Sequence, residues 1–597
     1  MVSEHASRCS AISRALGHSS LAAVLVCIHV SLLAWNARRQ SPTIDEPAHL
    51  VAGISYWKTG RFDLYAVNPP LVRLVAALPV LGMSPRLDRL DFTARPDDRP
   101  EFALGRAFIQ HNGERAFSMF TRARLACIPF SVLGAAVCYL WSARLAGRTA
   151  GLLSLALWCF FPETLAHGCL ITADAPAAAT GILAGFLFWR WLHNQNWKSA
   201  ALSGIACGLA ILTKTTSLTL LALWPVLWLA WCARRRPAPS RQWLTALRQL
   251  AVSLGIALFV VNAGYLFQGS LTPLGEFDFL STSFTGNSEA SPLIRVPGNR
   301  FQQTWLAAVP VPFPAPLVQG LDLQSRDFEN YMPLYLGGRW LAGGCWYAYF
   351  YIALVKWPLG FWLLLWLRVI GAWKAPRVQD SIVLLAPPAC LLALASLVAT
   401  PGYARYILPA LPFLFVWCAQ LGAARLNSVV IRLTAWCACA WLIVSSLSIY
   451  PHSLAYFNEF AGGPRNGSAH LIDCNIDWGQ DLFELARWQE LHPDASPFFV
   501  AYHGQVNPRL RGIAFRSPRP DTETPEGVPT WAPGYYAISV HILRGGLAFM
   551  YDDEGRFLPR QRPELSRFQF EEPVDKVGYS LFVYRMGAGR SERDNSF

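Results

Sequence analysis

Long apolar runs constrain this chain more than any other feature of its sequence. Such runs recur up to residue 450, and about 20 apolar residues are needed to cross the hydrocarbon core of a bilayer. Of the 597 residues, 53% are hydrophobic and only 15% are charged, whereas soluble domains carry about 25% charged residues. The sequence therefore predicts a polytopic α-helical membrane protein. We predict eleven spans, at about residues 21–36, 122–143, 149–166, 173–192, 199–213, 216–233, 246–267, 346–368, 380–400, 403–423 and 432–450.

Basic residues set the predicted orientation of these spans. No small-x-small cleavage site follows the first span, which we interpret as a retained anchor. Arg38 and Arg39 follow the first span and so lie on the predicted outer side, where the positive-inside rule expects few basic residues. The positive-inside rule places the N-terminus in the cytoplasm of a cell (inner) membrane protein and residues 451–597 outside. The formal charge of +13 then reflects topology and lipid headgroups, and we expect no nucleic-acid partner. The loops after even-numbered spans hold Arg144, Arg148, Lys198, Arg234 to Arg236, Arg241, Lys374, Arg377 and Arg425.

Three segments are expected outside the membrane, at about residues 37–121, 268–345 and 451–597. In the first, "PAHLVAGISYWKTG" has apolar residues at helical spacing, which predicts an amphipathic helix lying flat in the interface. Pro47 suits its first turn, and Asp45 or Glu46 could cap it. In the last, the β-rich runs "PFFVAYHG", "GYYAISVHIL" and "YSLFVYRM" follow a helical "DLFELARWQEL". We therefore divide the chain into a membrane domain, 1–450, and an extracytoplasmic α/β domain, 451–597.

Cysteine and histidine give little sign of a metal site or of a disulfide framework. Most of the 14 cysteines lie inside predicted spans, and Cys169, Cys345 and Cys474 outside them are widely spaced without a CxxC motif. The histidines of the outer segments share no metal-ligand spacing. Nothing in the spacing of these residues therefore predicts a metal centre.

The adjacent acids Asp45 and Glu46 stand just outside the first span, in "SPTIDEPAHL". At a helix start, an acidic pair commonly serves only as a cap that interacts with the helix dipole. The functional interpretation is that one carboxylate is a general base and that its neighbour orients it or holds a metal. Asp174, in "HGCLITADAPAA" at the outer end of the fourth span, has the same two interpretations, with Thr172 sharing the cap.

Two cations break the positive-inside trend. Lys214 lies between the fifth and sixth spans and Arg405 between the ninth and tenth, both on the predicted outer side. Each could simply extend to anionic headgroups. Two cations and two acidic sites at one membrane face nevertheless fit a site that binds a lipid-linked phosphate beside a base better than four unrelated features do.

These residues lie in motifs whose order resembles that of membrane glycosyltransferases of the C-type superfamily. The chain resembles in particular the bacterial relatives of protein O-mannosyltransferases and of lipid A aminoarabinose transferases, over about residues 25–450. The motifs are "DEPAH", "NPPL", "HGCLITADAP", "ILTKTT", "LYLGGRWLAGGCWYAYFYIALVKWPLG" and "RYILPALP". The start of the tail, "YFNEFAGGPRNGSAHLIDCNIDWGQDLFELARW", is similar to that of a bacterial subgroup. No single motif is specific, whereas their order and placement are.

The resemblance implies a polyprenyl-phosphate-linked sugar as donor and transfer at the outer face. It implies Asp45 as catalytic base with Glu46 beside it, Asp174 as the acid of the second outer loop, and Lys214 and Arg405 as ligands of the donor phosphate. Because some relatives hold a metal ion near the site, a divalent metal ion stays open as the one cofactor.

The chain departs from the family pattern at two positions. His49 stands where many bacterial relatives have tyrosine. Asn68 precedes "PPL" where a charged residue or histidine is common, which weakens any inference of a metal or phosphate contact there.

The residues support the same chemistry without the family. A polyprenyl phosphate leaves as an anion, so one carboxylate to deprotonate the acceptor and cations to stabilise the departing phosphate would suffice. In-line attack would invert the anomeric centre. A sugar-nucleotide enzyme would need a cytosolic nucleotide-binding domain, and the predicted cytoplasmic loops are too short for one.

Two further stretches have two interpretations each. Trp346 and Tyr347, in "GGRWLAGGCWYAYF", are either interface-belt residues or a surface on which a sugar stacks. Asp477 and Trp478, in "DCNIDWGQDL", belong either to a capped helix that packs on the membrane domain or to an acceptor groove.

We therefore predict a membrane glycosyltransferase, hexosyl or pentosyl, that uses a polyprenyl-phosphate sugar and a lipid, glycan or protein acceptor. The rival from another class is a lipid-linked saccharide transporter or flippase, which should show repeated halves, broken helices at the midplane or charge deep within spans. A third alternative is a sensor or partner-binding tail tethered to an inactive membrane part. The sequence names neither the sugar nor the acceptor.

Overall fold

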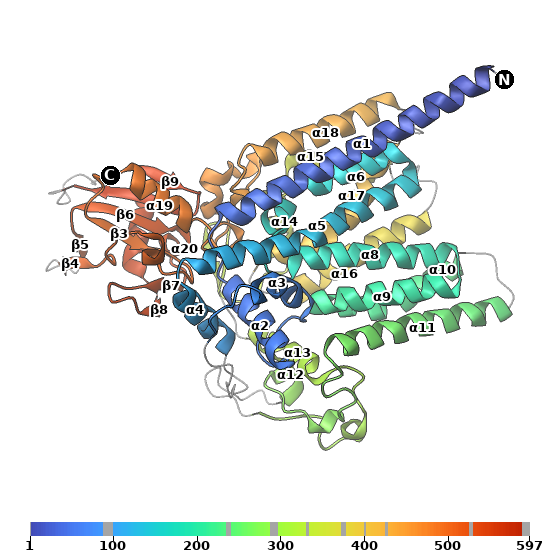
Figure 1. The fold of residues 1–597 in the computed structure, drawn as a ribbon, viewed down its shortest axis with the longest axis horizontal. Coiled ribbons are helices and arrows are strands. Elements are labelled where there is room, and N and C mark those ends of the chain that lie inside the picture. Colours follow the sequence, from blue (N-terminus) through green and yellow to red (C-terminus); the bar gives the residue numbers. More distant parts are fainter. Residues whose placement is uncertain are drawn as a thin grey trace.

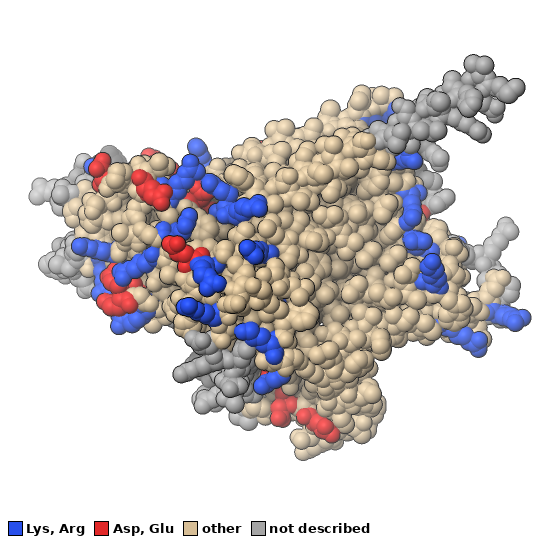
Figure 2. Space-filling model, in the orientation of Figure 1, with Lys and Arg blue, Asp and Glu red and all other residues tan. Residues whose placement is uncertain are grey.

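The computed structural model describes residues 2–87, 99–234, 240–286, 297–329, 333–371, 378–398, 402–423, 428–523, 529–560 and 562–587. Helices run side by side through most of the molecule, and the strands of the tail gather at one end (Figure 1). Figure 2 shows a broad band of uncharged surface across the helices, with lysines and arginines at the end away from the tail. This arrangement is the one expected of a multi-pass membrane protein.

Seven helical segments in the described ranges are long and apolar enough to cross a membrane. A pair of helices, α14 (Ala348–Lys356) and α15 (Leu359–Gly371), meets at 114° and makes an eighth if it counts as one span. The predicted fold class is confirmed, whereas the count of eleven is not. The seven are Ser19–Arg39 in α1 (Val2–Arg39), α5 (Arg115–Ala146), Thr215–Ala233 in η1 (Thr215–Leu218) and α10 (Thr219–Ala233), Arg241–Gly264 in α11 (Ser240–Gly264), Val378–Leu397 in α16 (Val378–Val398), Ala404–Gly422 from η5 (Ala404–Tyr406) through η6 (Leu408–Ala410) and α17 (Leu411–Ala419) to η7 (Gln420–Gly422), and α18 (Val429–Leu447).

The other three predicted spans are helical but differ from lipid-facing spans. Residues 149–166 form two helices, α6 (Arg148–Phe160) and α7 (Pro162–His167), and residues 199–213 form α9 (Trp197–Thr213), which is also short. Residues 173–192 form α8 (Asp174–His193), which packs against α5 and α9 and is buried along most of its length.

The first outer segment contains three helices, α2 (Glu46–Thr59), α3 (Leu71–Leu81) and α4 (Pro100–Asn112). The predicted helix after Pro47 is present, but residues 46–56 are buried between α3 and α4. The expectation of an amphipathic helix at the membrane surface is therefore wrong for this segment, because α3 and α4 cover the side of α2 that was expected to contact water. Trp57 is the exposed apolar exception, at 49%.

The second outer segment is irregular. It contains η2 (Leu274–Glu276), α12 (Thr282–Thr285), η3 (Trp305–Ala308), α13 (Ala315–Glu329) and a hairpin of β1 (Leu334–Leu336) and β2 (Arg339–Leu341). Gly337 and Gly338 form the hairpin turn with φ of 58° and 83°, a conformation that favours glycine. The hairpin contacts the tail, because the Gly337 N–H donates to the carbonyl of His470.

The tail contains a four-stranded mixed sheet in the order β3-β6-β10-β9, with β3 parallel to β6. The predicted β-rich runs form β3 (Phe498–Ala501), β6 (Gly534–Ser539) and β10 (Leu581–Met586), and the predicted helix is α19 (Leu482–Leu491). These four expectations are confirmed, and the boundary at residue 450 stays a prediction. The remaining elements are η8 (Ser453–Ala455), η9 (Glu459–Ala461), η10 (Pro464–Ala469), η11 (Asp473–Asn475), η12 (Pro508–Arg511), β4 (Pro520–Glu523), β5 (Pro529–Trp531), α20 (Val540–Leu543), β7 (Ala548–Tyr551), β8 (Phe557–Arg560), η13 (Pro563–Phe570) and β9 (Asp575–Val577).

Candidate functional site

Four charged residues from four separate segments form a continuous chain of ion pairs. Nη1 of Arg405 donates to Oδ2 of Asp45 at 2.9 Å and lies 4.0 Å from Oδ2 of Asp174. Nζ of Lys214 donates to Oδ1 of Asp174 at 2.6 Å. The order is therefore Asp45–Arg405–Asp174–Lys214, which we call the ion-pair chain. The structure brings together these four residues, which the sequence singled out.

Each member of the ion-pair chain stands where a helix begins or ends. Asp45 immediately precedes α2, Asp174 begins α8, Lys214 follows α9, and Arg405 lies in η5. Helix starts carry partial positive charge, which favours the carboxylates of Asp45 and Asp174 where they stand.

The structure does not support the capping interpretation of the two acidic sites. Within the described residues, the Asp45 side chain makes no capping hydrogen bond to α2 and instead faces Arg405. The hydroxyl of Thr172, expected to share a cap with Asp174, is buried without a partner in the described part of the chain. The expected capping hydrogen bonds are therefore absent among the described residues, because both carboxylates pair with cations from distant segments. Both acids do stand at helix starts, where the helix dipole favours negative charge.

Exposure differs along the ion-pair chain. The Asp174 and Lys214 side chains are 6% and 5% exposed, whereas the Asp45 side chain retains 18% of its surface and that of Arg405 retains 12%. Charges buried as deeply as those of Asp174 and Lys214 are stable only when they are paired. Asp45 is the carboxylate of the ion-pair chain that an incoming molecule reaches most easily.

Glu46 plays a different part from its neighbour. Its carboxylate is fully buried and accepts from Nε of Arg124 at 2.8 Å, from Nη2 of Arg124 at 2.5 Å and from the backbone N–H of Ile171 at 3.1 Å. It also accepts from the N–H and hydroxyl of Thr43 at 2.9 and 3.1 Å. Burial opposes the charge, but Arg124 and the backbone donors outweigh it and hold the pKa of Glu46 below its ordinary value. Both oxygens are committed to this network.

Aromatic rings surround the two cations. The Arg405 guanidinium lies 4.2 Å from the ring centroid of Trp478, 5.2 Å from that of Tyr403 and 5.7 Å from that of Tyr406. Nζ of Lys214 lies 4.8 Å from the ring centroid of Tyr406. Ring faces attract cations and displace water from them, so the site presents oriented positive charge with little hydration.

Asp477 lies apart from the ion-pair chain although Trp478 adjoins it. Asp477 is 1% exposed and accepts long hydrogen bonds of 3.4 Å from the N–H groups of Gly479 and His541. Burial raises the pKa of Asp477 to about 8. The cap expected for the helix of this stretch is wrong, because Asp481 precedes α19 without a capping side-chain bond among the described residues. The expected packing of that helix on the membrane domain is present, because Oε1 of Glu484 accepts from Nη2 of Arg39 at 2.7 Å.

His49 has a structural partner, whereas the predicted role of Asn68 as a contact stays a prediction. Nδ1 of His49 accepts from Nε of the buried Arg73 at 3.0 Å, and burial together with nearby arginines lowers the pKa of His49 well below its ordinary value. His49 is therefore a neutral acceptor that fixes Arg73. Asn68 has a φ of 66°, and its Oδ1 has no hydrogen-bond partner in the residues that the structure describes.

Trp346 and Tyr347 are exposed, at 69% and 45%, and their rings contact each other with centroids 5.7 Å apart. They precede α14 and take no part in the ion-pair chain. The choice between interface belt and sugar platform stays a prediction.

Sequence reasoning missed a second buried group of charges. Nζ of Lys356 lies 3.6 Å from Oε1 of Glu163, and Nε2 of His167 lies 3.4 Å from Oε2 of the same residue. Lys356 also donates at 2.8 Å to the carbonyls of Leu454 and Asn475. Lys356, Glu163 and also Arg124 lie inside predicted spans, where a charge is expected to have a function or a partner, and that signal could have identified them.

The arrangement does not fit a divalent metal ion as the residues stand. In the described ranges no three His, Cys, Asp or Glu side chains come close enough to hold one. Asp45 and Asp174 are each paired with a cation. The cysteines that the structure describes, from Cys27 to Cys474, are free thiols.

Residues 116–263 match the family model described as dolichyl-phosphate-mannose-protein mannosyltransferase. The match spans about a quarter of the chain and includes Asp174 and Lys214 but neither Asp45 nor Arg405. The resemblance to C-type membrane glycosyltransferases is confirmed in this segment. None of the curated proteins matches the chain by sequence.

Among solved structures, the chain is similar to ArnT from Cupriavidus metallidurans bound to undecaprenyl phosphate, with 12% identity, a TM-score of 0.43 and coverage of 94% of this chain and 97% of ArnT. It is similar to AglB, an oligosaccharyltransferase from Archaeoglobus fulgidus in complex with an inhibitory peptide and a dolichol-phosphate, with 12% identity, a TM-score of 0.41 and coverage of 94% and 75%. The S. cerevisiae Pmt1-Pmt2 protein O-mannosyltransferase complex bound to the sugar donor matches with 17% identity, a TM-score of 0.31 and coverage of 46% and 37%.

Proposed function

We propose that this protein is a membrane glycosyltransferase that moves one sugar from a polyprenyl-phosphate carrier to an acceptor at the extracytoplasmic face. The observation that carries the proposal is the ion-pair chain, which places two cations and two carboxylates at helix ends on the side of the tail. The family match over residues 116–263 supports it. The sugar is a hexose or a pentose.

Arg405 and Lys214 supply what the leaving group needs. When the bond between the anomeric carbon and the phosphate oxygen breaks, the carrier phosphate gains one negative charge. Cations fixed in a water-poor site stabilise such developing charge strongly. Nε of Arg405 is buried without a partner among the described residues, and it can donate to a phosphate oxygen.

Asp45 is the base in this mechanism. The acceptor hydroxyl attacks the anomeric carbon from the face opposite the phosphate, and its proton passes to Oδ1 or Oδ2 of Asp45 as the new glycosidic bond forms. The polyprenyl phosphate leaves with the electrons of the broken bond, so no acid is needed. Attack from the opposite face inverts the anomeric centre. Glu46 takes no proton, because its oxygens are filled by Arg124, Thr43 and Ile171.

Asp174 balances the charges of the two cations when no donor is bound. It pairs directly with Lys214 and lies 4.0 Å from Arg405. An incoming phosphate would compete with this carboxylate for the same N–H groups, which ties donor binding to a rearrangement of the ion-pair chain. No step of this mechanism requires a metal ion, and both carboxylates that could hold one are paired with cations.

The proposal is tested by sugar transfer in purified, lipid-reconstituted protein. Radiolabelled polyprenyl-phosphate sugars and a crude envelope acceptor are supplied to wild type, Asp45→Asn and Glu114→Gln. Glu114 is an exposed acid of the same outer segment and serves as the matched control. We expect wild type and the control to consume donor, and Asp45→Asn to be roughly 10²- to 10⁴-fold slower, the range for a lost general base.

Full activity of Asp45→Asn would refute Asp45 as base. An absence of transfer by wild type from every donor would favour the transporter or the tethered tail. The bent pair α14–α15 is the kind of broken helix that transporters use. Lys356 at its bend contacts Leu454 and Asn475 of the tail, so the break lies at the end of the bundle and not at its midplane.

A further inference from the structure

We infer that residues 473–480 of the tail, here called the brace, hold Asp45 and Arg405 at their working separation. The tail would then complete the catalytic site instead of acting as a separate module. This inference rests on the proposed function and assigns Trp478 as a positioning residue. It follows from contacts that the brace makes with both segments that carry the pair.

The brace first fixes the segment that carries Arg405. The hydroxyl of Tyr403 donates to Oδ2 of Asp473 at 2.9 Å, and the N–H of Ala404 donates to Oδ1 of Asn475 at 2.8 Å. Nδ2 of Asn475 donates in turn to the carbonyl of Gly402 at 3.1 Å. Three consecutive residues before Arg405 are therefore bonded to the brace.

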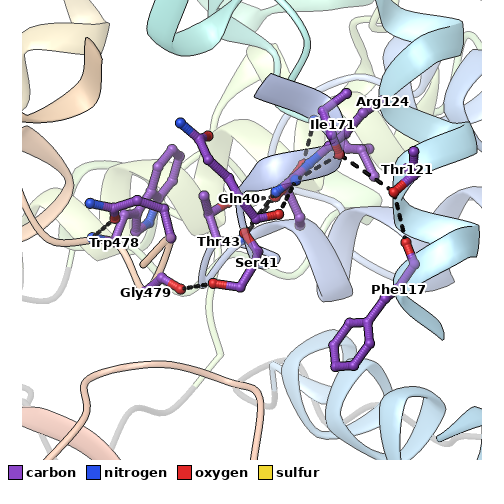
Figure 3. A network of polar contacts seen from close by, with 12 residues as sticks. Gln40, Ser41, Thr43, Phe117, Thr121, Arg124, Ile171, Trp478 and Gly479 are labelled. Carbon is purple, nitrogen blue, oxygen red and sulfur yellow. Dashed lines mark hydrogen bonds and ion pairs between the residues drawn. The ribbon is translucent and has the colours of Figure 1, made fainter. Parts of the chain in front are cut away.

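The brace also fixes the segment that carries Asp45. The N–H groups of Ser41 and Ile44 donate to the carbonyls of Gln480 and Trp478, each at 3.0 Å. The Ser41 hydroxyl donates to the carbonyl of Gly479 at 2.7 Å. Figure 3 shows Gln40, Ser41 and Thr43 with Trp478 and Gly479 on one side and Arg124 on the other. The segment before Asp45 thus has hydrogen-bond partners on both sides.

Trp478 adds a direct contact with the charged group itself. Trp478 is 2% exposed, and its ring centroid lies 4.2 Å from the guanidinium of Arg405, whose Nη1 bonds Asp45. A buried ring face limits the rotamers of an arginine and displaces water from it. Because two segments that are 360 positions apart meet here, a brace that bonds both is the simplest way to fix the distance between their side chains.

The fold of the tail holds the brace in place. The hydroxyl of Tyr502 donates to the carbonyl of Gly479 at 2.6 Å, and the N–H of His541 in α20 donates to Oδ2 of Asp477 at 3.4 Å. Gly479 has a φ of 80°, and a Cβ at this position would lie 2.9 Å from the Tyr502 hydroxyl. The brace therefore has little room to change its conformation independently of the rest of the tail.

A double-mutant cycle tests the brace. Trp478→Leu and Trp478→Phe are made in wild type and in Arg405→Lys, and kcat and KM for the donor are measured in reconstituted protein. Trp488→Phe is the matched control, because Trp488 is also nearly buried but bonds Asp575 in the tail. We expect Trp478→Leu to lower kcat/KM roughly tenfold or more and Trp478→Phe to retain most of it. When Arg405→Lys is already present, adding Trp478→Leu should lower kcat/KM by less than about threefold, because the effects of coupled residues do not add.

Equal fold-losses in the two backgrounds, or a loss no larger than that of Trp488→Phe, would overturn the inference. Tyr403→Phe deletes a single hydroxyl, so it gives the same cycle with Arg405→Lys if Trp478→Leu fails to fold. Binding of undecaprenyl phosphate, measured by the thermal shift it produces, separates this inference from the proposed function. If wild type binds this lipid without transferring sugar and Trp478→Leu weakens binding, the brace stands while the transferase fails. Where wild type transfers no sugar, equal binding by both would reject the brace.

Discussion

Replacing Glu46 by glutamine should destabilise the folded protein without removing a catalytic group. The two carboxylate oxygens accept five hydrogen bonds, from Arg124, Thr43 and Ile171. A glutamine keeps the shape but turns one oxygen into an NH₂ group. On the Oε1 side that group would face the N–H donors of Arg124 and Ile171, and on the Oε2 side those of Arg124 and Thr43. Neither orientation satisfies all the donors.

The magnitude follows from the burial of the pair. Arg124 is 1% exposed, and its other bonds go to backbone carbonyls, at 2.7 Å for Gln40 and 2.9 Å for Ser41. Removing one partner of a buried ion pair costs about 3–5 kcal/mol, because the remaining charge is left uncompensated. In a domain of 150–250 residues each kcal/mol shifts the melting temperature by about 2–4 °C, and by less in a longer chain. With an unfolding entropy of about 2.1 cal/mol/K per residue, a chain of 597 residues shifts by about 0.8 °C per kcal/mol, so we expect a fall of roughly 2–4 °C.

The assay is thermal unfolding in detergent, followed by tryptophan fluorescence at one fixed scan rate because unfolding of large chains is commonly irreversible. Asp45→Asn is the comparison, and its midpoint should stay close to that of wild type, since Asp45 is partly exposed. Well below the midpoint, folded Glu46→Gln should still consume donor. A variant that melts like wild type but loses donor consumption a hundredfold would show that Glu46 acts in the chemistry, and the reasoning would be refuted.

Three other predictions concern pH, charge and packing. Burial raises the pKa of Asp477 to about 8, so between about pH 4 and pH 8 the folded state binds one more proton than the unfolded state and stability falls as pH rises. Asp477→Asn should flatten the decline of the unfolding midpoint between about pH 6 and pH 8, and an unchanged slope would contradict this. Lys214→Met removes the 2.6 Å partner of Asp174 and should lower kcat/KM for the donor on the order of 10²- to 10³-fold. Steady-state kinetics measure this loss, and a loss of less than about threefold would disprove the prediction. A Cβ on Gly53 would lie 2.2 Å from the carbonyl oxygen of Arg73, so Gly53→Ala should lower the free energy of unfolding by about 1–3 kcal/mol. The measurement is the unfolding midpoint, which should fall. An unchanged midpoint would show that α2 and α3 move apart without cost and would contradict the prediction.

The candidate site was predictable as far as charge placement reveals it. Lys214 and Arg405 stood out because they interrupt the positive-inside pattern, and Asp45 and Asp174 because acids at membrane helix ends are costly unless paired. The structure joins all four in one chain of ion pairs. Their individual pairings were not predictable, since nothing in the local sequence states that Arg405 faces both carboxylates.

The difference between Asp45 and Glu46 was beyond sequence reasoning. The residues are adjacent and chemically alike, and both were assigned to catalysis. Arg124, 78 positions away from Glu46, fills the carboxylate of Glu46 and leaves Asp45 for Arg405. A charge inside a predicted span hinted that Arg124 had a partner, but the identity of that partner depends on how α5 packs beside the start of α2.

The sequence by itself determined the class of protein. Apolar runs long enough for a bilayer predict membrane helices, and the β-rich runs bounded by Pro and Gly after residue 490 predict β3, β6 and β10. These properties depend on hydrophobicity and backbone preference within windows of about 20 residues, which a single sequence displays directly. Only the tertiary structure decided that α2 is buried, that the brace contacts both site segments and that Trp478 lies on Arg405. Such contacts join residues hundreds of positions apart, and their distances are set by the packing of many side chains together, which no local pattern encodes.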